Sequence, residues 1–153
     1  MMYTIYSGTT FDHGYLALRS DFQEQLEMTH KDLNIEWVRF HNIFDDDVGI
    51  VNPRNPSLPY SYVNVDKIYD YIQLIGMKPL VEMDFMPSSF VPSGQTGSLY
   101  EYPVYVGPPN NYTEWYYFVK EFTQHLVDRY GADTVASWAF DAWNEPNVRL
   151  YIS

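Results

Sequence analysis

The chain has 153 residues, of which 46% are hydrophobic and 18% aromatic, and its formal net charge at pH 7 is −11. This length and apolar content suffice to bury the core of one domain, so the composition argues against disorder. The acidic balance, without any Lys/Arg cluster, argues against a nucleic-acid partner. The absence of cysteine excludes disulfides and thiolate metal ligands.

Neither a membrane span nor a signal peptide is expected. No stretch approaches the ~18 consecutive apolar residues of a membrane span, and Met1–Gly8 lacks the basic and apolar regions of a signal peptide. We therefore expect a soluble chain with no membrane partner. Its compartment stays unknown, with the cytoplasm as the default.

The first part of the chain alternates strand-like and helix-like segments. Tyr3–Tyr6 is β-prone and predicts a first strand. Ser20 followed by Gln23 has the spacing of a capping box, and the apolar stripe behind it predicts a helix that ends at Asn34. Ile35–His41 predicts a buried strand.

The alternation continues after a Pro-rich loop. Apolar residues at helical spacing predict a second helix from about Asn64 to Gly76, and Pro79–Phe85 predicts a third strand. The next segment, Met86–Asn111, is long and rich in Pro and Gly. Connections of this length are usually functional, so we expect a structured loop that forms the wall of a cleft.

The last elements complete an α/β pattern. Thr113 is predicted to cap a third helix that ends at Gly131, and Val135–Trp143 predicts the fourth strand. Helical crossovers join parallel neighbours, so three such units and a fourth strand predict a parallel sheet. The fold class is therefore α/β, and the pattern leaves undecided whether the sheet is open or part of a barrel.

Polar side chains gather where these strands end, which is where α/β folds carry their functional groups. The candidate site residues are His13, Arg39, His41, Asp84, Asn144 and Glu145. Strand alternation also places Glu82 on the same face of its strand as Asp84. A carboxylate on a buried strand needs a partner, and Arg39 is the expected partner of Glu82.

The most specific motif is WAFDAWNEPN at Trp138–Asn147. An Asn-Glu-Pro triplet at the tip of a fourth barrel strand resembles the acid/base motif of a large clan of retaining glycosidases. Further segments narrow the resemblance to glycoside hydrolase family 39, on its β-xylosidase side rather than that of the α-L-iduronidases. These segments are Arg39–Val51, Tyr60–Ile72, Gly76–Pro87, Gly107–Trp115 and His125–Gly131.

The resemblance implies a fold, a reaction and residue roles. It implies that residues 1–153 are the N-terminal half of a (β/α)8 TIM-barrel catalytic domain, with about four parallel strands and three helices. Glu145 matches the acid/base and must be protonated when substrate arrives. Asn144 matches a ligand of the sugar 2-hydroxyl, His41 a substrate-binding histidine, and Arg39 the arginine that braces the nucleophile. The expected ligand is a β-xyloside or related glycoside, with no cofactor and no metal.

Two departures from the family pattern matter. The stretch Thr9–Leu18 lacks the usual Gly-Arg pair, which leaves His13 as a candidate substrate contact there, with Asp84 as another on the third strand. The chain also ends eight residues after Glu145, and no carboxylate follows it. A retaining mechanism needs a second carboxyl roughly 5 Å away. We therefore expect the chain to be inactive alone, and either to self-associate or to require a complementary C-terminal half.

Two other functions remain open on the sequence. One is a non-catalytic carbohydrate-binding or vestigial protein that kept the cleft and lost hydrolysis. The other is a metal-dependent enzyme with His13, His41, Asp84 and Glu145 as ligands. The triplet 45–47, three consecutive aspartates, lacks the spacing of a calcium loop and is expected to be a solvated loop.

Overall fold

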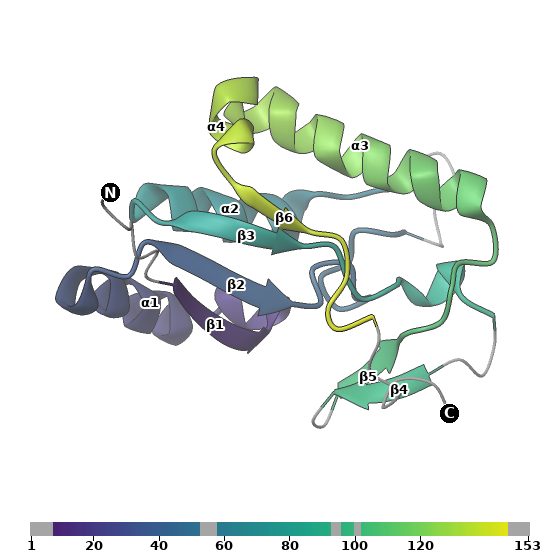
Figure 1. Ribbon diagram of the computed structural model, residues 1–153, viewed down its shortest axis with the longest axis horizontal. Helices are drawn as coiled ribbons and strands as arrows, with labels where there is room; N and C mark the ends of the chain where they lie inside the picture. The colour runs from purple at the N-terminus through teal and green to yellow at the C-terminus, as the bar shows by residue number, and fades with distance from the viewer. Residues whose placement is uncertain (1–7, 53–57, 93–95, 100–101, 147–153) are drawn as a thin grey trace, which may run out of the picture.

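The computed structural model is built on a parallel sheet with the order β1-β2-β3-β6, formed by Gly8–His13, Trp37–His41, Lys78–Glu82 and Ala139–Asp141 (Figure 1). The structure describes residues 8–52, 58–92, 96–99 and 102–146. Strand order follows chain order, so each crossover joins adjacent strands. The prediction of a parallel α/β sheet is confirmed.

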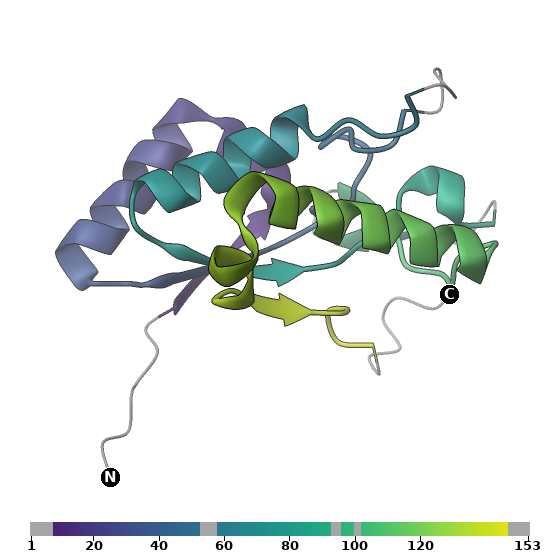
Figure 2. The same cartoon turned by 90° about the horizontal axis from the view of Figure 1, so that it is seen from above.

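Three long helices cover one side of this sheet. These are α1 (Ser20–Leu33), α2 (Val63–Leu74) and α3 (Tyr112–Tyr130), and all three lie above the strands in Figure 2. A short helix, α4 (Ala132–Ala136), follows α3 directly. A parallel strand layer with helices on one side only fits part of an α/β barrel, in agreement with the partial barrel predicted above.

The core lies between the strands and these helices. Val38 and Phe40 of β2 and Val81 of β3 are at most 2% exposed and face the helices. The helices contribute equally buried side chains, among them Ile68, Ile72, Phe122 and Leu126. Burying a side chain of this size stabilises the fold by roughly 1.5–3 kcal/mol. Because these positions alternate along the strands, Arg39, His41 and Glu82 face the other side.

The start of the chain differs from the prediction in detail. The strand expected at Tyr3–Tyr6 lies outside the described residues. The capping box is wrong: Arg19 is the N-cap of α1, without a side-chain cap, and the Gln23 amide donates to the Ala17 carbonyl at 2.8 Å. The preceding 3-10 turn, η1 (Gly14–Leu18), shifts the helix start, so Ser20 falls inside the first turn.

Other element bounds also shift. Asn111, rather than Thr113, caps α3, because its side chain accepts the N–H groups of residues 113 and 114. The fourth strand is shorter than the predicted Val135–Trp143 and spans only Ala139–Asp141. Gly131, with φ of 84°, lets the chain turn sharply after α3 and begin α4, whose last turn reaches Ala136.

The long connection after β3 contains structure that the sequence did not reveal. It holds a short 3-10 turn, η2 (Ser88–Phe90), and an antiparallel hairpin of β4 (Thr96–Leu99) and β5 (Tyr102–Tyr105). Figure 1 shows this hairpin beyond the carboxyl ends of the sheet strands. The prediction of a structured connection is confirmed, and its hairpin was missed because TGSL carries no apolar alternation. None of the helices in the described ranges is long and apolar enough to cross a membrane.

Candidate active site

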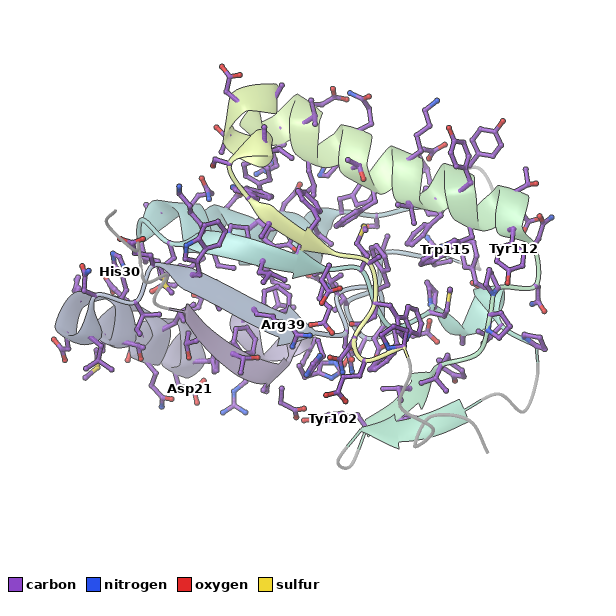
Figure 3. The ribbon with its side chains drawn as sticks, in the orientation of Figure 1. Asp21, His30, Arg39, Tyr102, Tyr112 and Trp115 are labelled. Carbon is purple, nitrogen blue, oxygen red and sulfur yellow. The ribbon has the colours of Figure 1, made fainter. Side chains whose placement is uncertain are left out.

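Arg39 is the centre of a polar network on the open side of the sheet. Its Nη2 lies 2.7 Å from Oε2 of Glu82 and 2.9 Å from Oδ1 of Asn144. The Glu82 side chain is fully buried, while that of Arg39 is 25% exposed. The predicted Arg39–Glu82 ion pair is confirmed. Figure 3 shows Arg39 on β2, with nitrogen and oxygen atoms of other side chains gathered near the end of that strand.

His41 belongs to the same network. Its Nδ1 lies 2.7 Å from Oε1 of Glu82. Burial lowers the pKa of His41, with Arg39 acting in the same direction, while the nearby carboxylates of Asp84 and Glu145 oppose the shift. A neutral imidazole that donates from Nδ1 to a carboxylate presents Nε2 as an acceptor. His41 is therefore arranged to accept a hydrogen bond from a hydroxyl.

Asp84 is buried and holds two backbone segments of the network together. It is 0% exposed, and its two oxygens accept the backbone N–H of Asn42 at 3.0 Å and that of Asn144 at 3.2 Å. Burial, followed by the neighbouring Glu82 carboxyl, raises the pKa of Asp84 to about 8. The carboxyl thus ties the loop after β6 to the end of β2. Its direct contact with substrate stays a prediction.

Asn144 and Glu145 are adjacent in the chain and differ in their surroundings. Asn144 is 8% exposed, with its backbone bonded to Asp84 and its side chain to Arg39. Glu145 is exposed and has a φ of 44°. The tight turn therefore fixes Asn144 inside the network and places Glu145 at the rim. The Glu145 carboxylate still lies near enough to His41 to affect its pKa.

His13 is placed beside the network rather than within it. It is 2% exposed, with Nδ1 3.0 Å from Nδ2 of Asn42 and Nε2 2.7 Å from Oδ2 of Asp47. The Tyr102 ring lies against it, with centroids 4.5 Å apart. Asn42 links His13 to Asp84, and sequence reasoning missed this role. The signal for Asn42 was its place directly after a predicted strand, where a φ of 70° favours Asn. Substrate contact by His13 stays a prediction.

The four-residue metal set expected as an alternative is not brought together. Among the described residues, His41 groups with Glu82 and Asp84, while His13 groups with Asp45 and Asp47. Neither group contains Glu145. The physical reason is that His13 points under the β4–β5 hairpin, whereas Glu145 lies at the rim beyond β6.

The expectation of a solvated loop at residues 45–47 is wrong for Asp45. Its side chain is only 5% exposed, because the loop turns back against β1 and β5. Burial raises the pKa of Asp45 to about 8; His13 opposes this shift, and Asp47 adds to it. Asp46 is exposed and accepts the backbone N–H of Ser88 at 3.1 Å.

Asp45→Asn is expected to reduce the loss of stability at high pH. Because the folded pKa of Asp45 is raised above its unfolded value near 3.8, its favourable contribution is present below about pH 4 and is lost as pH rises towards about 8. Asparagine cannot ionise. Relative to wild type, the variant should gain at least about 1.4 kcal/mol at pH 8 compared with pH 5. Urea unfolding at both pH values, in the presence of a chelator so that no cation occupies the carboxyl, measures this difference.

Asp32→Asn provides the matched control, because Asp32 is exposed on α1 and the substitution removes the same charge. Its pH dependence should equal that of wild type. Buried Asp84 contributes with the same sign in all three proteins, so the comparison isolates residue 45. Equal pH dependence in Asp45→Asn and wild type would contradict the buried environment described for this carboxyl.

Comparison with known proteins identifies the family. The model of glycosyl hydrolases family 39 matches residues 3–152. The β-xylosidase of Caldicellulosiruptor saccharolyticus is 38% identical over 138 residues, covering 90% of this chain and 28% of that protein. The β-xylosidase of Geobacillus stearothermophilus is 30% identical over 137 residues, covering 87% of this chain and 27% of that protein.

Solved structures agree with the sequence comparisons. A monomeric β-xylosidase from Caulobacter crescentus has a TM-score of 0.87 at 31% identity, covering 95% of this chain and 29% of its own. A family 39 enzyme from Xanthomonas axonopodis pv. citri has a TM-score of 0.86 at 29% identity, with 95% and 28% covered. The chain thus spans under a third of the length of these relatives. It belongs to glycosyl hydrolase family 39.

Proposed function

We propose that residues 1–153 form the N-terminal half of the catalytic barrel of a retaining glycosidase that acts on β-xylosides, with Glu145 as its acid/base. One observation carries most of the weight: the buried bonds of Asn144 to Arg39 and Asp84 hold the following Glu145 exposed at the rim. The two curated relatives named above are β-xylosidases, which supports the choice of sugar.

Each proposed role follows from the groups that the network leaves available. Glu145 would protonate the leaving glycosidic oxygen and then take a proton from the attacking water. Oδ1 of Asn144 accepts the hydrogen bond from Nη2 of Arg39, so Nδ2 of Asn144 remains to donate to the sugar 2-hydroxyl. Nε2 of His41 would accept a hydrogen bond from a sugar hydroxyl. This arrangement needs no cofactor.

The nucleophile is proposed to come from a complementary C-terminal half. The carboxylates in the centre of the described network are already engaged, since Glu82 pairs with Arg39 and Asp84 accepts two backbone N–H groups. Neither is free to attack a sugar carbon. A second carboxyl roughly 5 Å from Glu145 would complete a retaining site.

The edge of the sheet supports docking of that half. In the described residues β6 pairs only with β3, and Phe140 on β6 is 41% exposed on the helix side of the sheet. Beyond it, Trp115, Val119 and Val127 line a shallow hollow on α3. A further strand and helix would cover both surfaces. Self-association through the same edge stays a prediction.

The proposal is tested by completing the barrel. The chain is fused at its end to the part of the Caldicellulosiruptor β-xylosidase that lies beyond the matched region, and hydrolysis of an aryl β-xyloside is measured. We expect background rates for the chain alone and measurable turnover for the fusion, abolished by Glu145→Ala in the fusion.

Two results would count against the proposal, and they differ in meaning. Full activity of the chain alone would show that no second half is needed. A fusion that folds by circular dichroism and binds xylo-oligosaccharides, yet never turns them over, would instead favour a vestigial carbohydrate-binding protein.

A further inference from the structure

A small cavity with acidic, histidine and tyrosine side chains in its lining lies between the end of β1, the loop after β2 and the β4–β5 hairpin. Its volume is about 200 Å³. Its lining includes His13, Asp45, Asp47, Tyr102 and Tyr105. Tyr102, labelled in Figure 3, marks the hairpin side of the cavity below the end of the sheet. The cavity is separate from the Arg39 network, and the proposed reaction uses none of its carboxylates.

One oxygen of a buried carboxyl group in this cavity has no hydrogen-bond partner among the described residues. Asp45 is 95% buried, since its exposed fraction is 5%, and its Oδ1 accepts no hydrogen bond. A buried polar atom without a partner costs on the order of 1–3 kcal/mol. In native proteins, bound water or a bound ion is a common partner of such an atom.

The neighbouring groups suit a cation. One ligand atom each from His13, Asp45 and Asp47 lies within 4.8 Å of the others. An imidazole nitrogen with two carboxylate oxygens is a donor set for Zn²⁺, which binds both types at roughly 2.0–2.2 Å. Donor atoms around a tetrahedral ion are then roughly 3.4 Å apart. Small side-chain movements would therefore bring all three groups onto one ion.

Asn42 provides the support that a metal-binding histidine requires. A metal on Nε2 of His13 leaves the proton on Nδ1, which must then donate to an acceptor. Asn42 presents Nδ2 to that nitrogen at 3.0 Å, and its own Oδ1 is buried without a partner. Rotation of the amide by 180° exchanges the two atoms and makes Oδ1 the acceptor.

The other histidine–carboxylate group is less suited to a cation. His41, Glu82 and Asp84 are equally close to one another. However, Glu82 pairs with the Arg39 guanidinium, and both oxygens of Asp84 accept backbone N–H groups. A fixed positive charge and occupied lone pairs oppose metal binding there.

We propose that His13, Asp45 and Asp47 bind a divalent cation, with Zn²⁺ preferred, and that Asn42 orients the His13 imidazole. The ion would fasten the end of β1 to the loop after β2, beneath the hairpin. Its function is structural, and it is independent of the proposed glycosidase activity.

The test measures the ion directly in the full chain. Protein freed of metal with a chelator is titrated with ZnCl2, MnCl2 and CaCl2 by calorimetry, and thermal unfolding is followed with each ion. We expect one saturable Zn²⁺ site that raises Tm, with weaker binding of Ca²⁺. Asp45→Asn should weaken Zn²⁺ binding by at least about tenfold. Co²⁺ should give a visible absorption band that is lost in His13→Gln.

Controls separate this site from loose binding to an acidic chain. Asp32→Asn removes the same charge from the exposed surface of α1, outside the cavity lining, and should change the affinity by less than about threefold, as expected of an exposed charge that is largely screened. If His13→Gln fails to fold, Asp47→Asn tests the same site, because the Asp47 side chain is 40% exposed and its substitution disturbs the fold less. The absence of saturable Zn²⁺ binding, or equal binding by wild type, Asp45→Asn and Asp47→Asn, overturns the proposal.

Discussion

In the completed barrel, Glu145→Gln is expected to slow turnover of xylosides with poor leaving groups by roughly 10²- to 10⁴-fold. An alkoxide leaving group needs a proton as the glycosidic bond breaks, and glutamine cannot supply it. Activated aryl xylosides need little protonation, so their glycosylation step should lose much less. Pre-steady-state measurement of glycosylation on both substrate classes tests this difference.

The control and a rescue make the assignment specific. Glu24→Gln changes an exposed glutamate on α1 and should leave both rates unchanged. Azide should restore turnover of an activated aryl xyloside by Glu145→Gln, because this small nucleophile needs no base to deprotonate it. An equal loss on both substrate classes would show that Glu145 acts by position or charge and is not the proton donor.

Sequence patterns predicted the sheet well because the relevant signals are local. Val38 and Phe40 alternate with Arg39 and His41, so one strand already separates a core face from a polar face. The same reasoning predicts the pair of Arg39 and Glu82, whose Nη2 and Oε2 atoms lie 2.7 Å apart. The fourth strand was predicted too long because Val135 and Trp138 are apolar, as strand residues would be. In the structure, both pack into the core, Val135 from α4 and Trp138 from the turn that follows it.

The sequence identified the residues of the site but did not show which of them are buried and which are exposed. The motif indicated Asn144 and Glu145 together, and only tertiary contacts with Asp84 and Arg39 bury the first and expose the second. The burial of Asp45 was unpredictable for the same reason. Three consecutive aspartates normally indicate a solvent-exposed loop, and only the hairpin that folds back over this loop buries one of them.

Arg39→Ala is expected to destabilise the chain by roughly 3 kcal/mol at pH 8, because it leaves the fully buried Glu82 carboxylate without its guanidinium partner. Asn144 would also lose the donor to its Oδ1. Burial already raises the pKa of Glu82 against the opposing effect of Arg39, and removal of Arg39 raises it further. A raised folded pKa costs stability as pH rises, so the deficit should be smaller at pH 5 than at pH 8. Urea unfolding at both pH values tests the size and the sign.

Arg19→Ala is the matched comparison, since the Arg19–Asp21 ion pair has both side chains more than half exposed. Loss of an exposed pair costs little stability and should depend little on pH in this range. Arg39→Lys separates charge from geometry: it keeps the positive charge near Glu82 but cannot reach Glu82 and Asn144 with one planar group, so an intermediate loss is expected. If Arg39→Ala were no more destabilising than Arg19→Ala, the hydrogen bonds of Arg39 would not be what holds Asn144 in place and Glu145 at the rim.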